Sequence, residues 1–211
     1  MKKQRLSRAE SQILTKQRIV ESASRLFLEK GFVGTSLEEV AREAGYTIGA
    51  IYSNFGNKVE IGIAVVDQLL TGLTRRVLDA FMEGDYENLS DALEGIWVAL
   101  EPDWGSSSWT RLETEIMMSA TKDHQFQMSI GHRYEQVQRL IRSALEKIYS
   151  IIGTPPPTDI DAKALSILGL IVGLGLQRTM NRDMPLAELK KSLLTSMEAI
   201  VVFDSSPEKV A

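Results

Sequence analysis

The segment 47–55 combines two kinds of side chain within one short stretch. Ile48, Ile51 and Phe55 are large, apolar and spaced so that they lie on one face of a short helix. The opposite face then carries only small or hydrogen-bonding side chains: Thr47, Gly49, Ala50, Ser53 and Asn54. A rigid helix with such a face fits the major groove of duplex DNA, which is about 12 Å wide, and its amide and hydroxyl groups match the polar edges of bases. The pattern therefore favours a surface that contacts bases.

The residues before this segment predict the helix that positions it. Ser36 with Glu39, or Thr35 with Glu38, forms a capping box that begins a helix. Gly45 ends that helix after about two turns, because glycine accepts the positive φ that a tight turn requires. Two short helices joined in this way predict a helix-turn-helix motif. An αα-corner inside an all-helical core fits the same pattern, so the spacing alone leaves both interpretations open.

A longer helix is expected before this pair. Its apolar seam begins at Ile13, with Leu14 widening it, and continues through Val20 to Phe27 before Gly31 ends the helix. Four cations precede the seam without apolar partners: Lys2, Lys3, Arg5 and Arg8. We expect residues 1–12 to form a basic N-terminal arm and the start of the first helix, and such an arm could reach an adjacent DNA groove.

The charge of the chain is distributed unevenly. Residues 1–60 hold ten Lys and Arg against seven Glu and no Asp, although the whole chain has a net charge of −4. A basic N-terminal part on an acidic body predicts a polyanion as partner for that part, and a solvated charged face remains the alternative. Lys58, at the predicted N-terminus of a fourth helix, adds a cation where free amides already favour an anion.

The composition excludes several classes of protein. The 211 residues are 44% hydrophobic and 25% charged, which is close to the average for globular domains. Without cysteine there is no disulfide scaffold, thiolate metal site or cysteine nucleophile. His124 and His132 lie about 12 Å apart along a helix, too far for one metal. No nucleotide-binding or hydrolase motif occurs, so we expect no catalytic residue, metal or cofactor. The longest apolar run is too short to cross a membrane, which favours a cytoplasmic protein.

Residues 13–73 resemble the TetR family of bacterial transcriptional regulators. The resemblance rests on the order and spacing of QRIVESASRLFLEKGF (17–32), GTSLEEVAREAG (34–45), TIGAIYSNF (47–55) and Asn57-Lys58. It implies a DNA-binding domain over 13–73, with the helix-turn-helix near 36–55 and its recognition helix at 47–54. Where many relatives carry an aromatic residue and a histidine before the phenylalanine, this chain has Ser53 and Asn54.

The resemblance also implies roles for single residues. Tyr52 corresponds to the family tyrosine whose hydroxyl contacts a backbone phosphate, and Lys58 would bind a second phosphate. Further expected contacts to DNA are Thr35, Ser36, Arg42, Thr47, Gly49, Ala50, Ser53 and Asn54.

The rest of the chain predicts further helices. Their expected ranges are 59–83, 89–100, 109–122, 124–152, 160–181 and 185–203, with breaks at Gly84, at 102–108 and at 153–157. The fold class is therefore all-α: a three-helix N-terminal domain joined by a long fourth helix to a helical domain over 74–204, followed by a tail at 205–211.

The resemblance implies that this second domain dimerises and senses a ligand. The helices at 160–181 and 185–203, the latter with Leu186, Leu189, Leu193, Met197 and Ile200 at heptad-like spacing, are the expected homodimer interface. Burial of these residues inside one chain is the alternative. A pocket for a small-molecule effector of unknown identity would be lined by Trp97, Trp109, Met117, Phe126 and Tyr134, although such residues are commonly core.

The expected function is that of a DNA-binding regulator. It would bind a double-stranded, pseudo-palindromic operator as a dimer, most simply as a repressor, and a ligand in the second domain would release it. A helical enzyme and a protein-binding adaptor with a non-functional helix-turn-helix are the alternatives.

Overall fold

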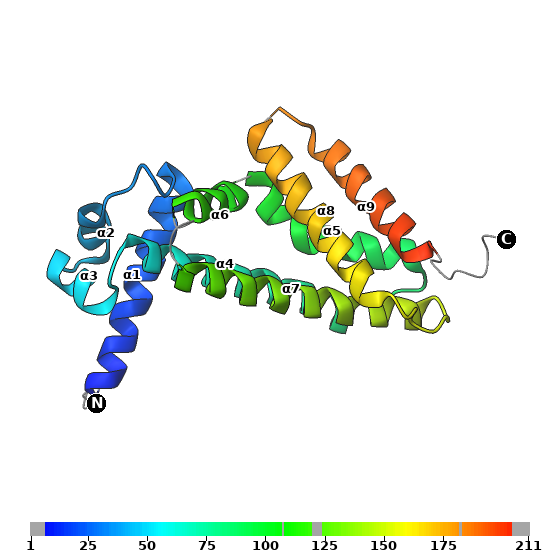
Figure 1. Cartoon of the computed structure of the whole chain (residues 1–211), viewed down its shortest axis with the longest axis horizontal. Helices are drawn as coiled ribbons and strands as arrows, with labels where there is room; N and C mark the ends of the chain where they lie inside the picture. Colours follow the sequence, from blue (N-terminus) through cyan, green and yellow to red (C-terminus); the bar gives the residue numbers. More distant parts are fainter. Residues whose placement is uncertain (1–6, 107, 120–123, 182, 204–211) are drawn as a thin grey trace. The chain divides into compact units, whose positions relative to one another are not determined.

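The computed structural model describes residues 7–106, 108–119, 124–181 and 183–203, and helices make up most of this part. Within these residues there are nine helices and no strand (Figure 1). The helices are α1 (Arg8–Lys30), α2 (Leu37–Ala44), α3 (Ile48–Asn54), α4 (Lys58–Glu83), α5 (Leu89–Ser106), α6 (Ser108–Ser119), α7 (His124–Ile151), α8 (Ile160–Met180) and α9 (Leu186–Val202). The expected all-α fold class is confirmed.

Two compact units make up the chain. The first consists of residues 1–71 and 111–122, and the second of residues 72–110 and 123–211. The sequence placed the whole of 74–204 in one domain, but the C-terminal part of α6 belongs to the first unit. The reason is local packing: Ile116 is buried against Gly62 and Phe32, where even a Cβ on Gly62 would approach Ile116 to 3.0 Å.

The core of the first unit joins α1, α2 and α3. Ile19, Ala23 and Phe27 of α1 are fully buried, as are Val40 of α2 and Ile51 of α3. Burying a side chain of this size contributes about 1.5–3 kcal/mol, so these few residues hold the short helices α2 and α3 in place. Helices of eight and seven residues are marginal by themselves and depend on this packing.

The N-terminal half of α1 differs from its expected role. Ser7 caps the helix and the capping box with Glu10 is complete, so α1 begins at Arg8 and this arginine is not part of an arm. Residues 1–6 lie outside the described residues. The apolar seam is buried only from Ile19 onward, whereas Ile13 and Leu14 are 56% and 42% exposed.

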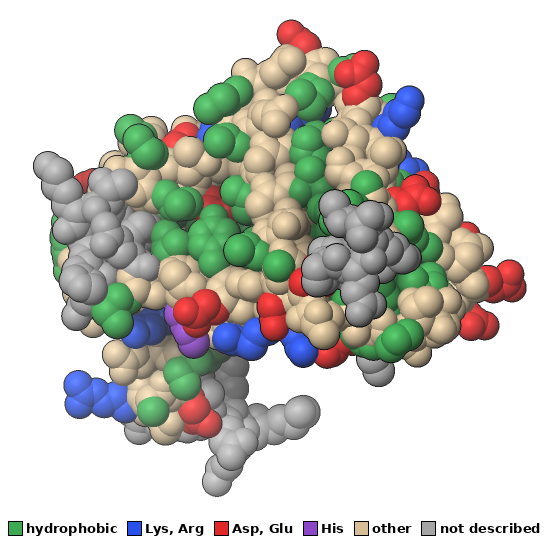
Figure 2. Space-filling view, turned by 45° about the vertical axis from the view of Figure 1, so that its right-hand side comes forward, with side chains coloured by type: hydrophobic (Ala, Val, Ile, Leu, Met, Phe, Trp, Pro, Cys, Tyr) green, Lys and Arg blue, Asp and Glu red, His purple; other side chains and the backbone are tan. Residues whose placement is uncertain are grey.

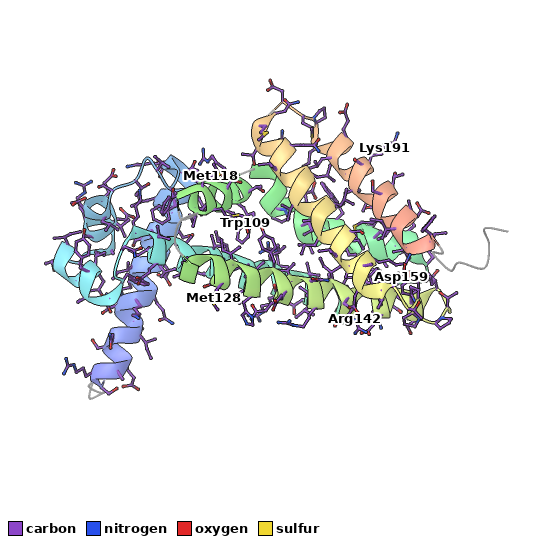
Figure 3. All side chains as sticks on the ribbon, viewed as in Figure 1. Trp109, Met118, Met128, Arg142, Asp159 and Lys191 are labelled. Atoms are coloured by element: carbon purple, nitrogen blue, oxygen red, sulfur yellow. The ribbon has the colours of Figure 1, made fainter. Side chains whose placement is uncertain are left out.

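The core of the second unit is a large apolar cluster. Its side chains come from α4, α5, α7, α8 and α9 and include Phe81, Trp97, Ile148, Ile167 and Leu193. The side-chain guanidinium of Arg142 on α7 (labelled in Figure 3) binds Glu146 and, at 2.9 Å, Asp161 of α8. This ion pair joins α7 to the first turn of α8 beside the core.

Helix α9 presents its leucine seam to its own chain. Leu189, Leu193 and Met197 are buried in the core cluster. These three residues are therefore committed to the core of their own chain, whereas a homodimer interface through the helices 160–181 and 185–203 stays a prediction. The leucine seam is buried because α5 and α8 both pack against α9.

Helix α8 is apolar on more than its buried face. Ala164, Ile167 and Leu168 are buried, while Leu165 and Val172 are exposed. Figure 2 shows hydrophobic side chains reaching the surface on one face of the molecule. By length and composition alone α8 could cross a membrane. A core helix passes the same test, and α8 contains the buried Lys163, whose Nζ donates hydrogen bonds to the carbonyls of Ile200 and Phe203.

Most predicted helix boundaries agree with the structure to within a few residues. The exception is α5, which passes through Pro102 instead of ending before it. Proline has no N–H to bond the Val98 carbonyl, but Val98 lies on an exposed part of the helix, where water can solvate that carbonyl. The C-terminal tail at 205–211 lies outside the described residues.

Candidate nucleic-acid interface

The turn between α2 and α3 is fixed by local hydrogen bonds. Ser36 caps α2, and its capping box with Glu39 is complete. Gly45 ends α2 with a φ of 74°, and its N–H donates to the carbonyls of Ala41 and Arg42. The side chain of Thr47 then accepts from the Ala50 N–H and begins α3. This arrangement is a helix-turn-helix.

One face of α3 anchors it and the other faces outward. Ile51 is fully buried and Phe55 nearly so. Ile48, which the sequence placed on the buried face, is exposed because it occupies the first position of the helix. On the outward face Thr47, Gly49 and Ser53 are exposed and Ala50 is half-buried. Most of the face predicted to contact bases is thus exposed, although Ala50 and Asn54 are half-buried.

The two polar side chains at the end of α3 bond to the same backbone group. Ser53 Oγ donates to the Ala50 carbonyl at 3.0 Å, and Asn54 Nδ2 donates to it at 2.8 Å. Asn54 Oδ1 is buried and has no hydrogen-bond partner. Both side chains are therefore folded back onto the helix in this structure.

Three residues predicted to contact DNA outside the base-reading face are accessible. Tyr52 is 55% exposed, so its ring is not a core aromatic. Arg42 is exposed in the last turn of α2, and Ser36 is exposed at its start. All three lie on the helix-turn-helix.

Thr35 does not have the predicted role. Its side chain is only 2% exposed, and its hydroxyl donates to the carbonyls of Gly31 and Leu26 near the end of α1. The hydroxyl is therefore committed to the turn between α1 and α2 and cannot also donate to a phosphate. Residue type alone does not distinguish Thr35 from Ser36, because only packing decides which of the two hydroxyls is buried.

Lys58 begins α4, as predicted, but its ammonium group is directed back onto the protein. Its Nζ lies 4.6 Å from the centre of the Phe32 ring and 3.5 Å from the Val33 carbonyl. Burial lowers the pKa of Lys58, and the nearby carboxylates of Glu115 and Glu39 oppose that shift. The cation is thus half-buried at the edge of the unit.

Two residues of α6 fix the turn that carries Val33. Glu115 accepts the Val33 N–H at 3.1 Å, and Arg111 donates to the Leu28 carbonyl at 2.9 Å. Sequence reasoning did not find this pair, and no local signal could have revealed it, because the partners are more than eighty residues apart.

A polar groove between the start of α1 and the end of α3 was also missed. Its volume is about 600 Å³ and it is lined by Ser7, Arg8, Ser11, Gln12, Thr15, Ser53 and Asn54. The capping box Ser7-Arg-Ala-Glu10 is a signal that could have located the start of α1 and placed Arg8 on the helix.

The predicted effector residues are divided between the two units. Trp97 is 3% exposed and lies in the core cluster of the second unit. Trp109 (Figure 3) and Tyr134 are half-buried in that unit, whereas Met117 belongs to the first. The side chain of Phe126 lies outside the described residues. Among the described residues no three His, Cys, Asp or Glu are grouped to hold a metal ion.

Comparison with known proteins identifies the N-terminal domain. The model of the family of bacterial regulatory proteins named tetR matches residues 19–65. The HTH-type transcriptional regulator TtgR of Pseudomonas putida is 44% identical over 55 residues, and this match covers 26% of each chain. The matched region thus spans about a quarter of that relative.

Solved structures resemble the chain over most of its length. A TetR-family transcriptional regulator from Mesorhizobium loti superposes with a TM-score of 0.73 at 18% identity, covering 93% of this chain and 98% of the other. Thermus thermophilus FadR, a TetR-family repressor in complex with lauroyl-CoA, gives 0.64 at 17% identity, covering 91% and 97%. These likenesses establish the fold.

Fold and matched domain together define a helical protein with an N-terminal helix-turn-helix of the bacterial regulator type. Through residues 19–65 the chain is similar to the tetR family of bacterial regulatory proteins.

Proposed function

We propose that this chain is a transcriptional regulator that binds duplex DNA through α3. The observation that carries the proposal is the outward face of α3: small and polar along its length, while Ile51 and Phe55 fix the helix from behind. The matched family consists of transcriptional regulators and not of enzymes, which favours this function over a helical enzyme.

The accessible residues have distinct proposed roles. Tyr52, Arg42 and Ser36 donate to phosphates, since they are exposed on the helix-turn-helix. Lys58 joins them when its ammonium group leaves the Phe32 ring. Contacts to base edges come from Thr47, Gly49, Ala50, Ser53 and Asn54, with the glycine and alanine allowing close approach.

The proposed partner of the second unit is a second copy of the chain. The leucine seam of α9 is buried in the core of its own chain. The outer face of α8 is therefore the candidate dimerisation surface. It carries the exposed side chains of Leu165 and Val172, and a Cβ at Gly169 or Gly173 would meet no described atom within 4 Å. Two such faces can pack closely, and a two-fold dimer would read a pseudo-palindromic operator.

The proposed regulation is release from DNA by a small molecule, most simply relieving repression in the cytoplasm. The support is that Thermus thermophilus FadR, which shares the fold, is a repressor in complex with lauroyl-CoA. Half-buried Trp109 and Tyr134 of the second unit remain the candidate contacts. A ligand that binds the DNA-free form more tightly would shift the population away from the operator.

Selection of duplexes from a random pool tests the proposal. The wild-type chain should enrich a two-fold related sequence, and its affinity should fall steeply with salt because phosphate contacts release counterions. Tyr52→Phe removes one hydroxyl and should weaken binding to all duplexes equally, by about 0.5–1.5 kcal/mol. Failure to enrich any duplex at low salt would favour the adaptor alternative.

A further inference from the structure

The groove between α1 and α3 borders the proposed recognition face. Ser53 and Asn54 line it from α3, while Arg8, Ser11 and Gln12 line it from α1, with Ser7 and Thr15 at its ends. Ser53 belongs to both surfaces, so the groove adjoins the outward face of α3. The two surfaces are therefore continuous.

The chemistry of the groove suits a phosphodiester. Every lining side chain carries a hydroxyl, an amide or a guanidinium, and none carries a carboxylate. The neighbouring Glu10 carboxylate accepts the Ser7 N–H at 2.7 Å and is part of the helix cap. Thr15 Oγ1 donates to the Ser11 carbonyl in this structure, so Arg8, Ser11 and Gln12 are the donors of α1 that remain.

The spacing of these donors along α1 is compatible with the spacing of phosphates along one strand of DNA. Residues 8, 11, 12 and 15 recur at the interval that places them on one face of a helix. From Arg8 to Gln12, the last of these donors, the helix rises about 6 Å, which is close to the axial rise of about two nucleotides in one strand. A row of donors of this length can reach successive phosphates.

We propose that this groove binds the sugar-phosphate backbone beside the bases that α3 contacts, so that α1 is a second DNA-binding element. Arg8 neutralises a phosphate, and Ser11 and Gln12 donate to phosphate oxygens. The proposal rests on the proposed function of α3 and extends the interface beyond the helix-turn-helix. Contacts of this kind position the protein on DNA and carry no sequence information.

Two substitutions of the same chemistry test the proposal. Gln12→Glu places a negative charge in the groove, whereas Gln17→Glu places one on the opposite face of the same helix, where Gln17 is exposed and does not line the groove. Gln12→Glu should weaken binding to the selected duplex about tenfold, and Gln17→Glu should weaken it much less. Arg8→Ala should reduce the slope of log affinity against log salt by about 1.

Ethylation of single phosphates locates the contact. Ethylated phosphates beside the half-site should interfere with wild-type binding and cease to interfere with Arg8→Ala. Circular dichroism should give all variants the wild-type melting temperature, since the substituted residues are exposed.

The outcomes separate this proposal from that of α3. Equal affinities for Gln12→Glu and Gln17→Glu, with an unchanged salt slope for Arg8→Ala, would overturn the role of the groove while wild-type binding still supports α3. If the wild-type chain binds no duplex, both proposals are overturned.

Discussion

The side-chain amide of Asn54 donates to the carbonyl of Ala50, one turn earlier on α3, at a distance of 2.8 Å. The Ser53 hydroxyl shares this acceptor. Both polar side chains at the end of α3 thus donate to the helix itself, while the buried Oδ1 of Asn54 has no partner. The proposed contact from Asn54 to a base requires the χ angles of Asn54 to change, so this contact would exchange one internal hydrogen bond for others.

Asn54→Ala should therefore affect DNA recognition more than folding. The variant loses an internal hydrogen bond but also removes a buried acceptor that has no partner, so its free energy of unfolding should change by less than about 1 kcal/mol. Discrimination at one base pair should fall by about 1–3 kcal/mol. Competition binding with single-base variants of the selected duplex measures this. A uniform loss over all variants would instead assign Asn54 to the phosphate backbone.

Two substitutions of Lys58 can separate the packing of its stem on Phe32 from the effect of its charge on DNA binding. Lys58→Met keeps an unbranched apolar stem beside the Phe32 ring, whereas Lys58→Ala removes both stem and charge. Both variants should reduce the slope of log affinity against log salt by about 1, because each loses one phosphate contact. Only Lys58→Ala should also lower the melting temperature. An unchanged slope in both variants would show that Lys58 stays on Phe32 in the complex.

The lowered pKa of Glu39 predicts that the first unit loses stability in acid. The Ser36 N–H and Lys30 hold the pKa of Glu39 at about 2, below its ordinary value of 4.5. Because the folded-state pKa is depressed, the stabilisation is complete above about pH 4.5 and is lost as the pH falls toward 2. Glu39→Gln keeps an acceptor for Ser36 but does not titrate. The gap in melting temperature between wild type and Glu39→Gln should be constant at neutral pH and disappear in acid.

Gly173 tests the proposed dimer. A Cβ at this position would meet no described atom within 4 Å, so Gly173→Glu should fold as a subunit but carry an unpaired carboxylate into the interface. Light scattering should give a mass near 23.5 kDa for the variant and twice that for wild type. Gly131→Glu on α7, where a Cβ is equally free, is the matched control and should remain dimeric. A folded Gly173→Glu monomer that binds the palindrome as tightly as wild type would contradict the two-fold model.

The local elements of the helix-turn-helix were predictable from the sequence. Ser36, Glu39, Gly45 and Thr47 begin and end their helices where predicted. Each acts through backbone groups no more than four residues away, so its effect depends on neighbours in the chain. The same reasoning overlooked Ser7 and Glu10, although their spacing carries the same signal.

Burial, in contrast, was decided by the tertiary structure. Periodicity identifies the apolar face of a helix but not what covers it: the seam of α9 faces its own core, and Ile13 at the start of α1 is exposed. The hydrogen bond from the Val33 N–H to the carboxylate of Glu115 likewise joins residues that are 82 positions apart. Such contacts form only when distant segments meet, because the free energy of burial belongs to pairs of surfaces and not to either sequence segment alone.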